Sequence, residues 1–411
     1  MADRSVRFRW AILGSTEYWL QLLLSFLLTP ILLKTLGLTE FGRWAFFQSL
    51  TEIGLLLSFG LPDALMREAA RDVESVHNIT RSVRRFQITM VTVLTGSACA
   101  VYAASGTGTT LLVLLALIQS LGRILELTAQ NLMKARGDFG GAARVNAAAR
   151  MMLPVFSAVA AWVYGLLWIV VLAGAVSALV AAALSWSRLG RRTRWNAGRE
   201  RGRSFKTILG YATASFVQNG LSAALGQLDK QLLMVFLGPD ALALYAVAQK
   251  AALPIHNLIV SATSHLFAVA SQAQRWSAEL VARFKSNWIF FAFVTVGLVG
   301  FFWVFSKPML VLWVGKDLAD HVTGFHQGLV LSYGLLSLTA VPMFFLNGVG
   351  EIRINLVSSF LSSAWVLGWT SFFLKRGYGI QGVVWGQWTN LVPVLVYLGV
   401  VSARVRGYRS H

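Results

Sequence analysis

The stretch Arg188–Lys206, RLGRRTRWNAGRERGRSFK, lies near the middle of the 411 residues and decides how the chain is interpreted. It carries seven Arg and one Lys against a single acid, Glu200. Long apolar runs flank it on both sides. A run of positive charge of this kind is typical of a nucleic-acid arm, a membrane-surface patch or a topology signal. The composition of the flanks distinguishes these three interpretations.

The flanking sequence has the composition of a membrane protein. Hydrophobic residues make up 56% of the chain, charged residues 13%, and the mean hydropathy is +0.62. A soluble protein is about a quarter charged. The net charge is +19, but its cations lie between apolar segments, which a membrane explains better than a nucleic-acid interface does. We therefore expect no nucleic-acid partner, and we interpret 188–206 as a basic cytoplasmic linker that rests on anionic membrane lipids.

A membrane-spanning helix needs about 20 mostly apolar residues, and by that rule we expect about twelve transmembrane helices. The predicted fold class is an all-α polytopic membrane protein. Its domains are an N-terminal six-helix bundle (1–187), the linker (188–206) and a C-terminal six-helix bundle (207–411). The predicted spans are 11–33, 41–62, 87–105, 110–132, 143–163, 166–187, 208–236, 243–268, 287–306, 328–348, 354–374 and 379–401.

The distribution of Lys and Arg predicts the orientation of these spans. With the N-terminus inside, 26 of the 36 cations fall in cytoplasmic segments, six fall outside, and four lie within spans. Cytoplasmic loops of membrane proteins carry the excess of Lys and Arg. The sequence therefore predicts a multi-pass membrane protein with both termini cytoplasmic.

A short internal repeat joins the two halves. Leu36-Gly37, Trp44-Ala45 and Gln48 match Leu237-Gly238, Tyr245-Ala246 and Gln249 at a shift of 201 residues. Each copy falls at the turn between the first two spans of its half. Because six spans separate the copies, both run in the same direction. Parallel repeats of this kind build transporters from two bundles around a central cavity.

Charged and amide side chains within the spans are the candidate site residues. Charges at membrane depth cost about 2.5–3.5 kcal/mol each, so they usually face a cavity or a partner. On one predicted helix, Gln119, Arg123, Glu126 and Gln130 follow a single stripe. The remaining charges within spans are Glu17, Glu52, Arg150, Asp229, Lys230 and Lys250.

Two interpretations of these charges stay open. They are structural pairs that neutralise one another, or they bind an anionic substrate and load a coupling ion. For substrate binding we predict Arg123, Lys250 and Arg150, with Gln119 and Gln130 of the polar stripe. For ion coupling the candidates are Asp229, Glu52, Glu17 and Glu126. Pro154, Pro254, Pro342 and Pro393 also lie inside spans, where they can kink helices and free carbonyl groups.

Several functional classes lack their signatures in this sequence. No GxxxxGK[ST] phosphate loop occurs, and no His, Cys or carboxylate cluster has metal-ligand spacing. We therefore expect no cofactor, no metal and no ATP hydrolysis by this chain. No predicted outer segment is longer than roughly 20 residues, as judged from the span length. A membrane enzyme such as a polysaccharide polymerase or ligase is therefore less favoured than a transporter.

Several motifs resemble one transporter family along nearly the whole chain. They are LLKTLGLTEFGRWAFFQSL (32–50), LSFGLPDALMREAA (57–70), GQLDKQLLMVFLGPDALALYAVAQK (226–250), PMLVLWVG (308–315) and GYGIQGVVWGQ (377–387). Together they resemble polysaccharide flippases of the multidrug/oligosaccharidyl-lipid/polysaccharide exporter superfamily. The chain lacks the two extra spans of the peptidoglycan-precursor flippases in that superfamily.

The resemblance implies a substrate and a mechanism. The expected substrate is an undecaprenyl-diphosphate-linked oligosaccharide, moved from the inner to the outer leaflet by alternating access, with polysaccharide assembly machinery as a candidate protein partner. Arg123, Arg150 and Lys250 would suit the diphosphate or acidic sugars. A proton- or sodium-coupled multidrug exporter of the same fold is the alternative, and a non-transporting scaffold would not need four cations at membrane depth.

Overall fold

The computed structural model describes residues 23–71, 76–104, 110–191, 208–210, 212–213, 216, 226–273 and 276–407. These residues form helices and the turns between them, and none of them lies in a strand. The chain divides into two compact units, Met1–Gln227 and Leu228–His411. Glu17 and residues 192–206 of the basic stretch lie outside the described residues. The domain boundaries at 187/188 and 206/207 stay a prediction.

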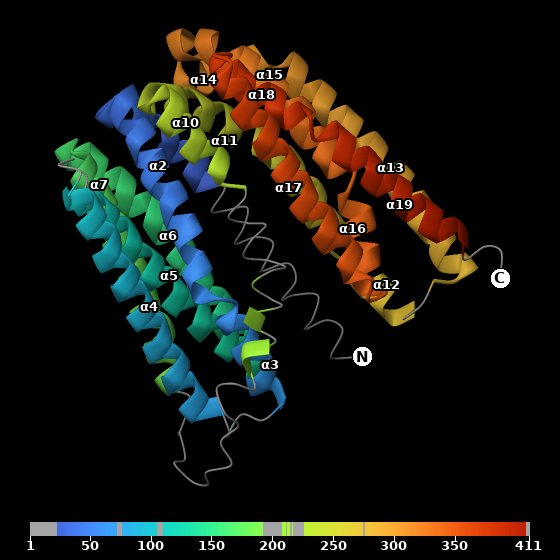
Figure 1. Ribbon diagram of the computed structural model, residues 1–411, viewed down its shortest axis with the longest axis horizontal. Helices are drawn as coiled ribbons and strands as arrows, with labels where there is room; N and C mark the ends of the chain where they lie inside the picture. The colour runs from blue at the N-terminus through green and yellow to red at the C-terminus, as the bar shows by residue number, and fades with distance from the viewer. Residues whose placement is uncertain are drawn as a thin grey trace. The chain divides into compact units, whose positions relative to one another are not determined.

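The N-terminal unit is built around one helix, α5, which contacts α2, α3, α4, α6 and α7 (Figure 1). A further short apolar helix, Leu23–Leu36, precedes α2. The helices of this unit are α2 (Leu38–Gly54), η1 (Leu55–Ser58), α3 (Leu61–Arg71), α4 (Val76–Ala104), α5 (Thr110–Ala135), α6 (Phe139–Tyr164) and α7 (Leu167–Arg191).

Small residues let the helices approach α5 closely. A Cβ atom at Gly122 of α5 would lie 2.8 Å from the backbone of Ala178 in α7. A Cβ atom at Gly54 of α2 would lie 2.2 Å from Oγ of Ser120 in α5. Membrane helices lack a hydrophobic driving force toward each other, so close backbone packing through small residues stabilises their contacts. The position of α5 is therefore fixed by its neighbours.

The C-terminal unit pairs α11 with α15, α12 with α16 and α17 with α18. These helices are drawn in yellow to red in Figure 1. They are α10 (Leu228–Leu237), α11 (Pro239–Thr263), α12 (Leu266–Ala273), α13 (Ala278–Val304), α14 (Ser306–Val314), α15 (Lys316–Ser337), α16 (Ala340–Gly348), α17 (Ile352–Lys375), α18 (Gly379–Trp388) and α19 (Leu391–Gly407).

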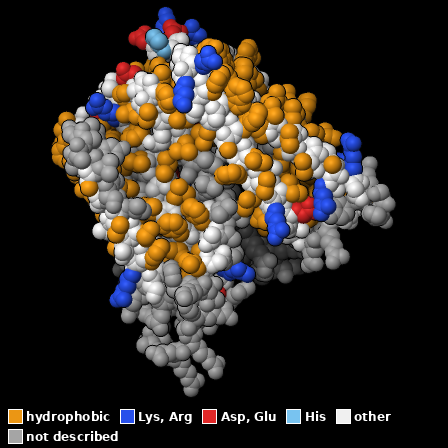
Figure 2. Space-filling view, in the orientation of Figure 1, with side chains coloured by type: hydrophobic (Ala, Val, Ile, Leu, Met, Phe, Trp, Pro, Cys, Tyr) orange, Lys and Arg blue, Asp and Glu red, His pale blue; other side chains and the backbone are white. Residues whose placement is uncertain are grey.

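The all-α polytopic membrane fold is confirmed. Among the described residues, seven helices are long and apolar enough to cross a membrane, or eight if the bent pair α2–α3 counts as one span. Large apolar side chains point outward: Trp162 is 75% exposed, Phe293 80% and Leu312 90%. Figure 2 shows hydrophobic side chains over much of the visible surface. Such a surface is stable in lipid and would associate in water. Each of the twelve predicted spans overlaps at least one of the described helices.

The internal repeat corresponds to a repeated backbone turn. Gly37 has φ 79° and ψ 169° immediately before α2, and Gly238 has φ 83° and ψ −176° immediately before α11. Almost only glycine adopts this combination of φ and ψ angles. The residues that follow in each copy, Trp44 and Tyr245, are both buried. The two matching sequences therefore encode the same entry into equivalent helices.

Two of the four prolines interrupt the spans that contain them. A proline ring clashes with the carbonyl group four residues earlier in a helix. Pro342 lies four residues after Leu338, where α15 gives way to α16, and Pro393 lies four residues after Thr389, where α18 gives way to α19. The predicted spans 328–348 and 379–401 are therefore broken helices, whereas Pro154 and Pro254 lie inside continuous ones.

Tryptophan side chains satisfy the carbonyl groups at both breaks. The indole Nε1 of Trp288 donates to the Leu338 carbonyl at 3.0 Å, and that of Trp365 donates to the Thr389 carbonyl at 3.1 Å. A carbonyl group left unpaired within a bilayer has no water to accept from. The two tryptophans therefore make these breaks tolerable at membrane depth.

Replacing Trp288 with phenylalanine should lower the free energy of unfolding by about 1–3 kcal/mol, because it leaves the Leu338 carbonyl group without a donor. Thermal unfolding of the purified protein in detergent measures the effect. Trp303→Phe on the same helix is the matched control, since Trp303 is 44% exposed to the surroundings. Equal unfolding temperatures for Trp288→Phe and the wild type would rule out this role.

The structure adds to one sequence-based boundary and corrects another. Residues 63–86 contain the end of α3, which continues to Arg71, and the start of α4 at Val76, and their cytoplasmic location stays a prediction. Span 208–236 was expected to be one long helix, but a turn at 226–227 precedes α10. Apolar composition alone locates a span and does not locate the ends of its helix.

Candidate functional site

The predicted polar stripe lies on α5, as its spacing requires. Gln119, Glu126 and Gln130 are buried, with exposed fractions of 5% or less, and Arg123 is half-buried. Because α5 has neighbours on several sides, these side chains meet other helices of the same unit. The stripe divides into an amide contact at one end and a charged cluster at the other.

The amide contact joins α2, α5 and α7. The Nε2 of Gln119 donates to Oε1 of Gln48 in α2 at 3.3 Å. On the other side, a Cβ atom at Gly174 of α7 would lie 2.9 Å from Oε1 of Gln119. Gln119 therefore fits closely among three helices.

The charged cluster places one acid between two bases. Glu126 accepts a hydrogen bond from Nε2 of Gln130 at 2.8 Å. It also interacts electrostatically with Arg123, one turn earlier on α5, and with Arg150 of α6. The Nε of Arg150 donates to Oδ1 of Asn146 at 3.0 Å. Four of the sequence-predicted residues thus belong to one cluster, in which two cations exceed the single acid.

Another acid predicted for the site, Glu52 of α2, does not join the cluster, because its side chain is exposed. The acid that the structure places with Arg123 is Glu126. Glu17 lies outside the described residues.

A second polar cluster lies inside the C-terminal unit around Asp229. This residue is in the first turn of α10 and is 3% exposed. The Tyr245 hydroxyl of α11 donates to its Oδ2 at 2.5 Å, and Nε2 of Gln249 lies 3.5 Å from the same oxygen. The backbone N–H of Lys230 donates to its Oδ1 at 2.7 Å. The carboxylate is therefore held by neutral donors at the positive end of a helix dipole.

The cluster continues to α15 and to two lysines. Nε2 of Gln249 donates to the Tyr333 hydroxyl at 2.9 Å. Lys230 interacts electrostatically with Asp229 and with Lys250, and both lysines are half-buried. Two residues predicted for the site from the sequence, Asp229 and Lys250, therefore belong to one cluster. This cluster has two cations and one acid, the same balance as the cluster in the N-terminal unit.

Tyr245, Gln249 and Tyr333 were not named as site residues from the sequence. Tyr245 and Gln249 are four residues apart on one helix, so they share a face. Both also belong to the internal repeat, and Gln48 is the repeat equivalent of Gln249. Each of these glutamines is hydrogen-bonded into the polar interior of its own unit. The shared helix face could have identified Tyr245 and Gln249 as site residues from the sequence. Nothing in the sequence connects Tyr333 to Asp229.

The two clusters differ in what they can do chemically. Arginine presents a planar fork of donors that binds phosphate and carboxylate groups, which suits the cluster around Glu126 to anions. A buried carboxylate with neutral donors can take up a proton or a cation, which suits Asp229 to ion loading. Among the described residues, no group of three or more His, Cys, Asp or Glu side chains could hold a metal ion.

An all-helical fold with seven or more membrane-length helices among its described residues defines a polytopic membrane protein. Solved structures of membrane transporters have the same fold. The inward-facing multidrug resistance MATE family transporter of the MOP superfamily has a TM-score of 0.75 at 14% identity, covering 97% of this chain and 99% of its own. Residues 31–323 match the family described as polysaccharide biosynthesis protein, and the chain belongs to that family.

Two further solved structures share the fold. The lipid II flippase MurJ, in its inward closed conformation, has a TM-score of 0.79 at 13% identity, covering 95% of this chain and 87% of its own. A MOP superfamily transporter from Pyrococcus furiosus has a TM-score of 0.60 at 16% identity, covering 97% and 94%. No curated protein matches the sequence. At these sequence identities, the structural similarity establishes the fold but not the substrate. The substrate has to be inferred from the chemistry of the residues.

Proposed function

We propose that the protein translocates an undecaprenyl-diphosphate-linked oligosaccharide across the plasma membrane by alternating access, coupled to an ion. The oligosaccharide would be a repeat unit of O-antigen, capsule or exopolysaccharide. The observation that carries this proposal is that a chain of the polysaccharide biosynthesis family has the fold of membrane transporters and of a lipid II flippase. Polysaccharide synthesis on a lipid carrier requires that the carrier's polar head group cross the bilayer.

The cations at membrane depth are the proposed ligands of the substrate. Arg123 and Arg150 of the N-terminal unit and Lys250 of the C-terminal unit would bind the diphosphate or acidic sugars. Gln119 and Gln130 support this arrangement through hydrogen bonds to Gln48 and Glu126. In both clusters the cations exceed the acids, which favours an anionic substrate.

Asp229 is the proposed ion-loading residue. It is buried, and its hydrogen-bond donors are two neutral side chains and a backbone N–H group. Glu126 interacts with two arginines. Its proposed role is therefore to position these arginines rather than to load the coupling ion. Glu52 and Glu17 remain secondary candidates for coupling.

A proton- or sodium-coupled multidrug exporter is the second candidate function. It is favoured by the likeness to the MATE transporter, which covers nearly the whole of both chains. Cationic drugs would meet Arg123, Arg150, Lys230 and Lys250, whose charge disfavours them. The excess of cations at membrane depth therefore places this candidate second.

The proposed location is the bacterial plasma membrane with both termini cytoplasmic. The support is the 26 cations assigned to inner segments against six assigned to outer ones. The stretch 188–206 would be the cytoplasmic linker between two six-helix bundles, 1–187 and 207–411. Membrane lipids and polysaccharide assembly machinery are the further proposed partners.

Binding of a short-chain substrate analogue tests the proposed substrate class. The purified full chain should bind a farnesyl-diphosphate-linked oligosaccharide saturably, and Arg123→Ala should weaken binding about tenfold, as expected for loss of a charge-assisted contact. The same oligosaccharide on farnesol, without the diphosphate, is the matched control ligand. Equal affinity for both ligands, together with tight binding of a cationic dye, would favour the exporter instead.

A further inference from the structure

A pocket of about 80 Å³ lies inside the C-terminal unit, where the two broken helices meet α17. Thr339 follows the break at Leu338, Pro393 lies four residues after the break at Thr389, and both line the pocket. Non-helical backbone at membrane depth is tolerated where it lines a cavity, and discontinuous helices of this kind form the substrate sites of many transporters. No residue assigned above to substrate binding or ion coupling is in the described lining, so the pocket is separate from the two charged clusters.

The lining of this pocket combines neutral polar groups with an apolar wall. None of the described lining residues is charged, and six of the ten carry a hydroxyl or an amide group. The polar residues are Thr339, Asn355, Ser358, Ser359, Ser362 and Tyr397, and the apolar ones are Leu336, Met343, Pro393 and Val394. Such a lining offers hydrogen bonds to a neutral ligand and nothing that would neutralise an ion.

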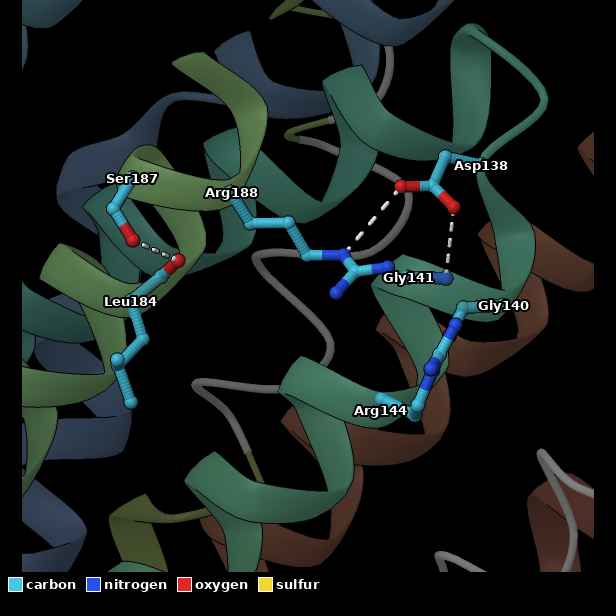
Figure 3. Close-up of polar contacts among 7 residues, drawn as sticks. All are labelled: Asp138, Gly140, Gly141, Arg144, Leu184, Ser187 and Arg188. Atoms are coloured by element: carbon cyan, nitrogen blue, oxygen red, sulfur yellow. Dashed lines mark hydrogen bonds and ion pairs between the residues drawn. The ribbon is translucent and has the colours of Figure 1, made fainter. Parts of the chain in front are cut away.

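Two of the serine hydroxyls in the pocket have unused hydrogen-bonding capacity. A serine in a helix often donates to the carbonyl group three or four residues earlier. Ser187 of the N-terminal unit does so, donating to the Leu184 carbonyl at 2.9 Å (Figure 3). Among the described residues, Ser358 and Ser359 have no hydrogen-bond partner. Their hydroxyl groups can therefore donate to and accept from a ligand.

The position of Ser359 on α17 shows that its exposure is to the pocket. Ser359 is exposed, although it lies four residues after Asn355 and seven before Val366, which are both buried. Residues at these spacings share one face of a helix. Ser359 also lies seven residues into the 24-residue helix α17, or about 10 Å along it. An exposed hydroxyl on the inward face at this depth implies a polar cavity within the span.

Hydrogen bonds between helices hold the walls of the pocket. Nδ2 of Asn355 in α17 donates to Oδ1 of Asn347 in α16 at 2.7 Å, and the Tyr397 hydroxyl of α19 donates to Oδ1 of Asn355 at 2.6 Å. On the same face of α17, the Ser362 hydroxyl donates to Oδ1 of Asn390 at the second break. These contacts fix the lining before any ligand arrives, which lowers the cost of binding.

We propose that this pocket, the Ser358–Ser359 pocket, binds the hydroxyl groups of one neutral sugar of the transported oligosaccharide. The inference rests on the proposed function and adds a sugar-binding site to it. The hydroxyls of Ser358 and Ser359 would bond the sugar hydroxyls, while Leu336 and Val394 would contact the C–H groups of the ring. A water molecule needs roughly 10–15 Å³ of such space. The pocket therefore admits several hydroxyl groups, and the rest of the oligosaccharide stays outside it.

Binding of four probes to the purified full chain tests whether the protein recognises a sugar. The probes are farnesyl diphosphate and farnesyl diphosphate linked to glucose, galactose or N-acetylglucosamine, in a detergent without a sugar head group. Titration calorimetry measures each affinity, and we expect at least one sugar-bearing probe to bind more tightly than farnesyl diphosphate. Equal affinity for all four probes would overturn the sugar site and leave the proposed function standing. No binding of any probe would contradict the proposed function and the sugar site together.

A double variant, Ser358→Ala with Ser359→Ala, connects the sugar preference to this pocket. It should bind the preferred sugar-bearing probe about tenfold more weakly, the effect of losing two hydrogen bonds, and bind farnesyl diphosphate as the wild type does. Its unfolding temperature should not fall, because neither hydroxyl has a partner among the described residues. Ser371→Ala, on α17 but outside the described lining, is the matched control. An unchanged affinity for the sugar-bearing probe, or an equal loss for farnesyl diphosphate, would overturn the proposal.

Discussion

Asp229→Asn should reduce transport to the level of protein-free vesicles while the protein still folds. Asparagine has nearly the same shape, and its side-chain oxygen can still accept from the Tyr245 hydroxyl, which lies 2.5 Å from Oδ2 of Asp229. The amide, however, can neither carry a negative charge nor take up a proton. If Asp229 loads the coupling ion, the cycle therefore stops at this step. Initial rates of substrate translocation in proteoliposomes measure the loss, and thermal unfolding verifies the fold.

Two variants separate ion loading from a general effect of the substitution. Asp240→Asn removes an exposed carboxylate from the first turn of α11 and should leave transport unchanged. Tyr245→Phe removes one donor but keeps the carboxylate, so it should retain part of the activity. Full transport by Asp229→Asn at a normal protein level would remove Asp229 from the mechanism.

Glu126→Ala should destabilise the N-terminal unit by about 1–3 kcal/mol, because it leaves the Gln130 amide without its acceptor and removes an acid that interacts with Arg123 and Arg150. Glu126 is 5% exposed and interacts with both Arg123 and Arg150. Without it, two like charges remain close together inside the helix bundle. The unfolding temperature in detergent should fall accordingly, and the yield of folded protein should fall with it.

A surface pair provides the matched control, and a double variant distinguishes structure from function. Glu279→Ala breaks an exposed pair with Arg283 at 2.7 Å and should cost no more than about 0.5 kcal/mol. Combining Glu126→Ala with Arg150→Ala should restore part of the stability, because fewer charges remain uncompensated. If transport also returns in the double variant, Arg150 is structural. If transport stays absent, Arg150 acts on the substrate.

Much of the fold can be predicted from the sequence because helices that cross a membrane consist of long apolar runs. Long apolar runs predicted the helices, and an Leu-Gly pair at residues 36–37 and 237–238 predicted equivalent turns. The positive φ angles of Gly37 and Gly238 explain why glycine occurs there. The spacing along α5 likewise predicted that Arg123, Glu126 and Gln130 share a face. These features depend on local periodicity, which one sequence contains.

The contacts between distant helices could not be predicted in this way. Tyr333 belongs to the Asp229 cluster through its hydrogen bond with Gln249, which lies 84 residues earlier in the sequence. No sequence pattern around either residue predicts this contact. The same holds for Trp288, which bonds a carbonyl group 50 residues away. The breaks at Pro342 and Pro393 were expected only as kinks, since the sequence does not say which prolines a neighbouring helix will support. Pairing across a bundle depends on three-dimensional packing, and periodicity does not encode it.

Translocation in a reconstituted system tests the proposed function most directly. Proteoliposomes would contain the purified protein and undecaprenyl-diphosphate-linked oligosaccharide, and an added lectin would report the sugar that reaches the opposite leaflet. We predict a time-dependent increase that needs the protein, persists with Asp240→Asn and disappears with Asp229→Asn. Sugar exposure equal to that of protein-free vesicles, while the same preparation expels a cationic dye along a proton gradient, would contradict the account.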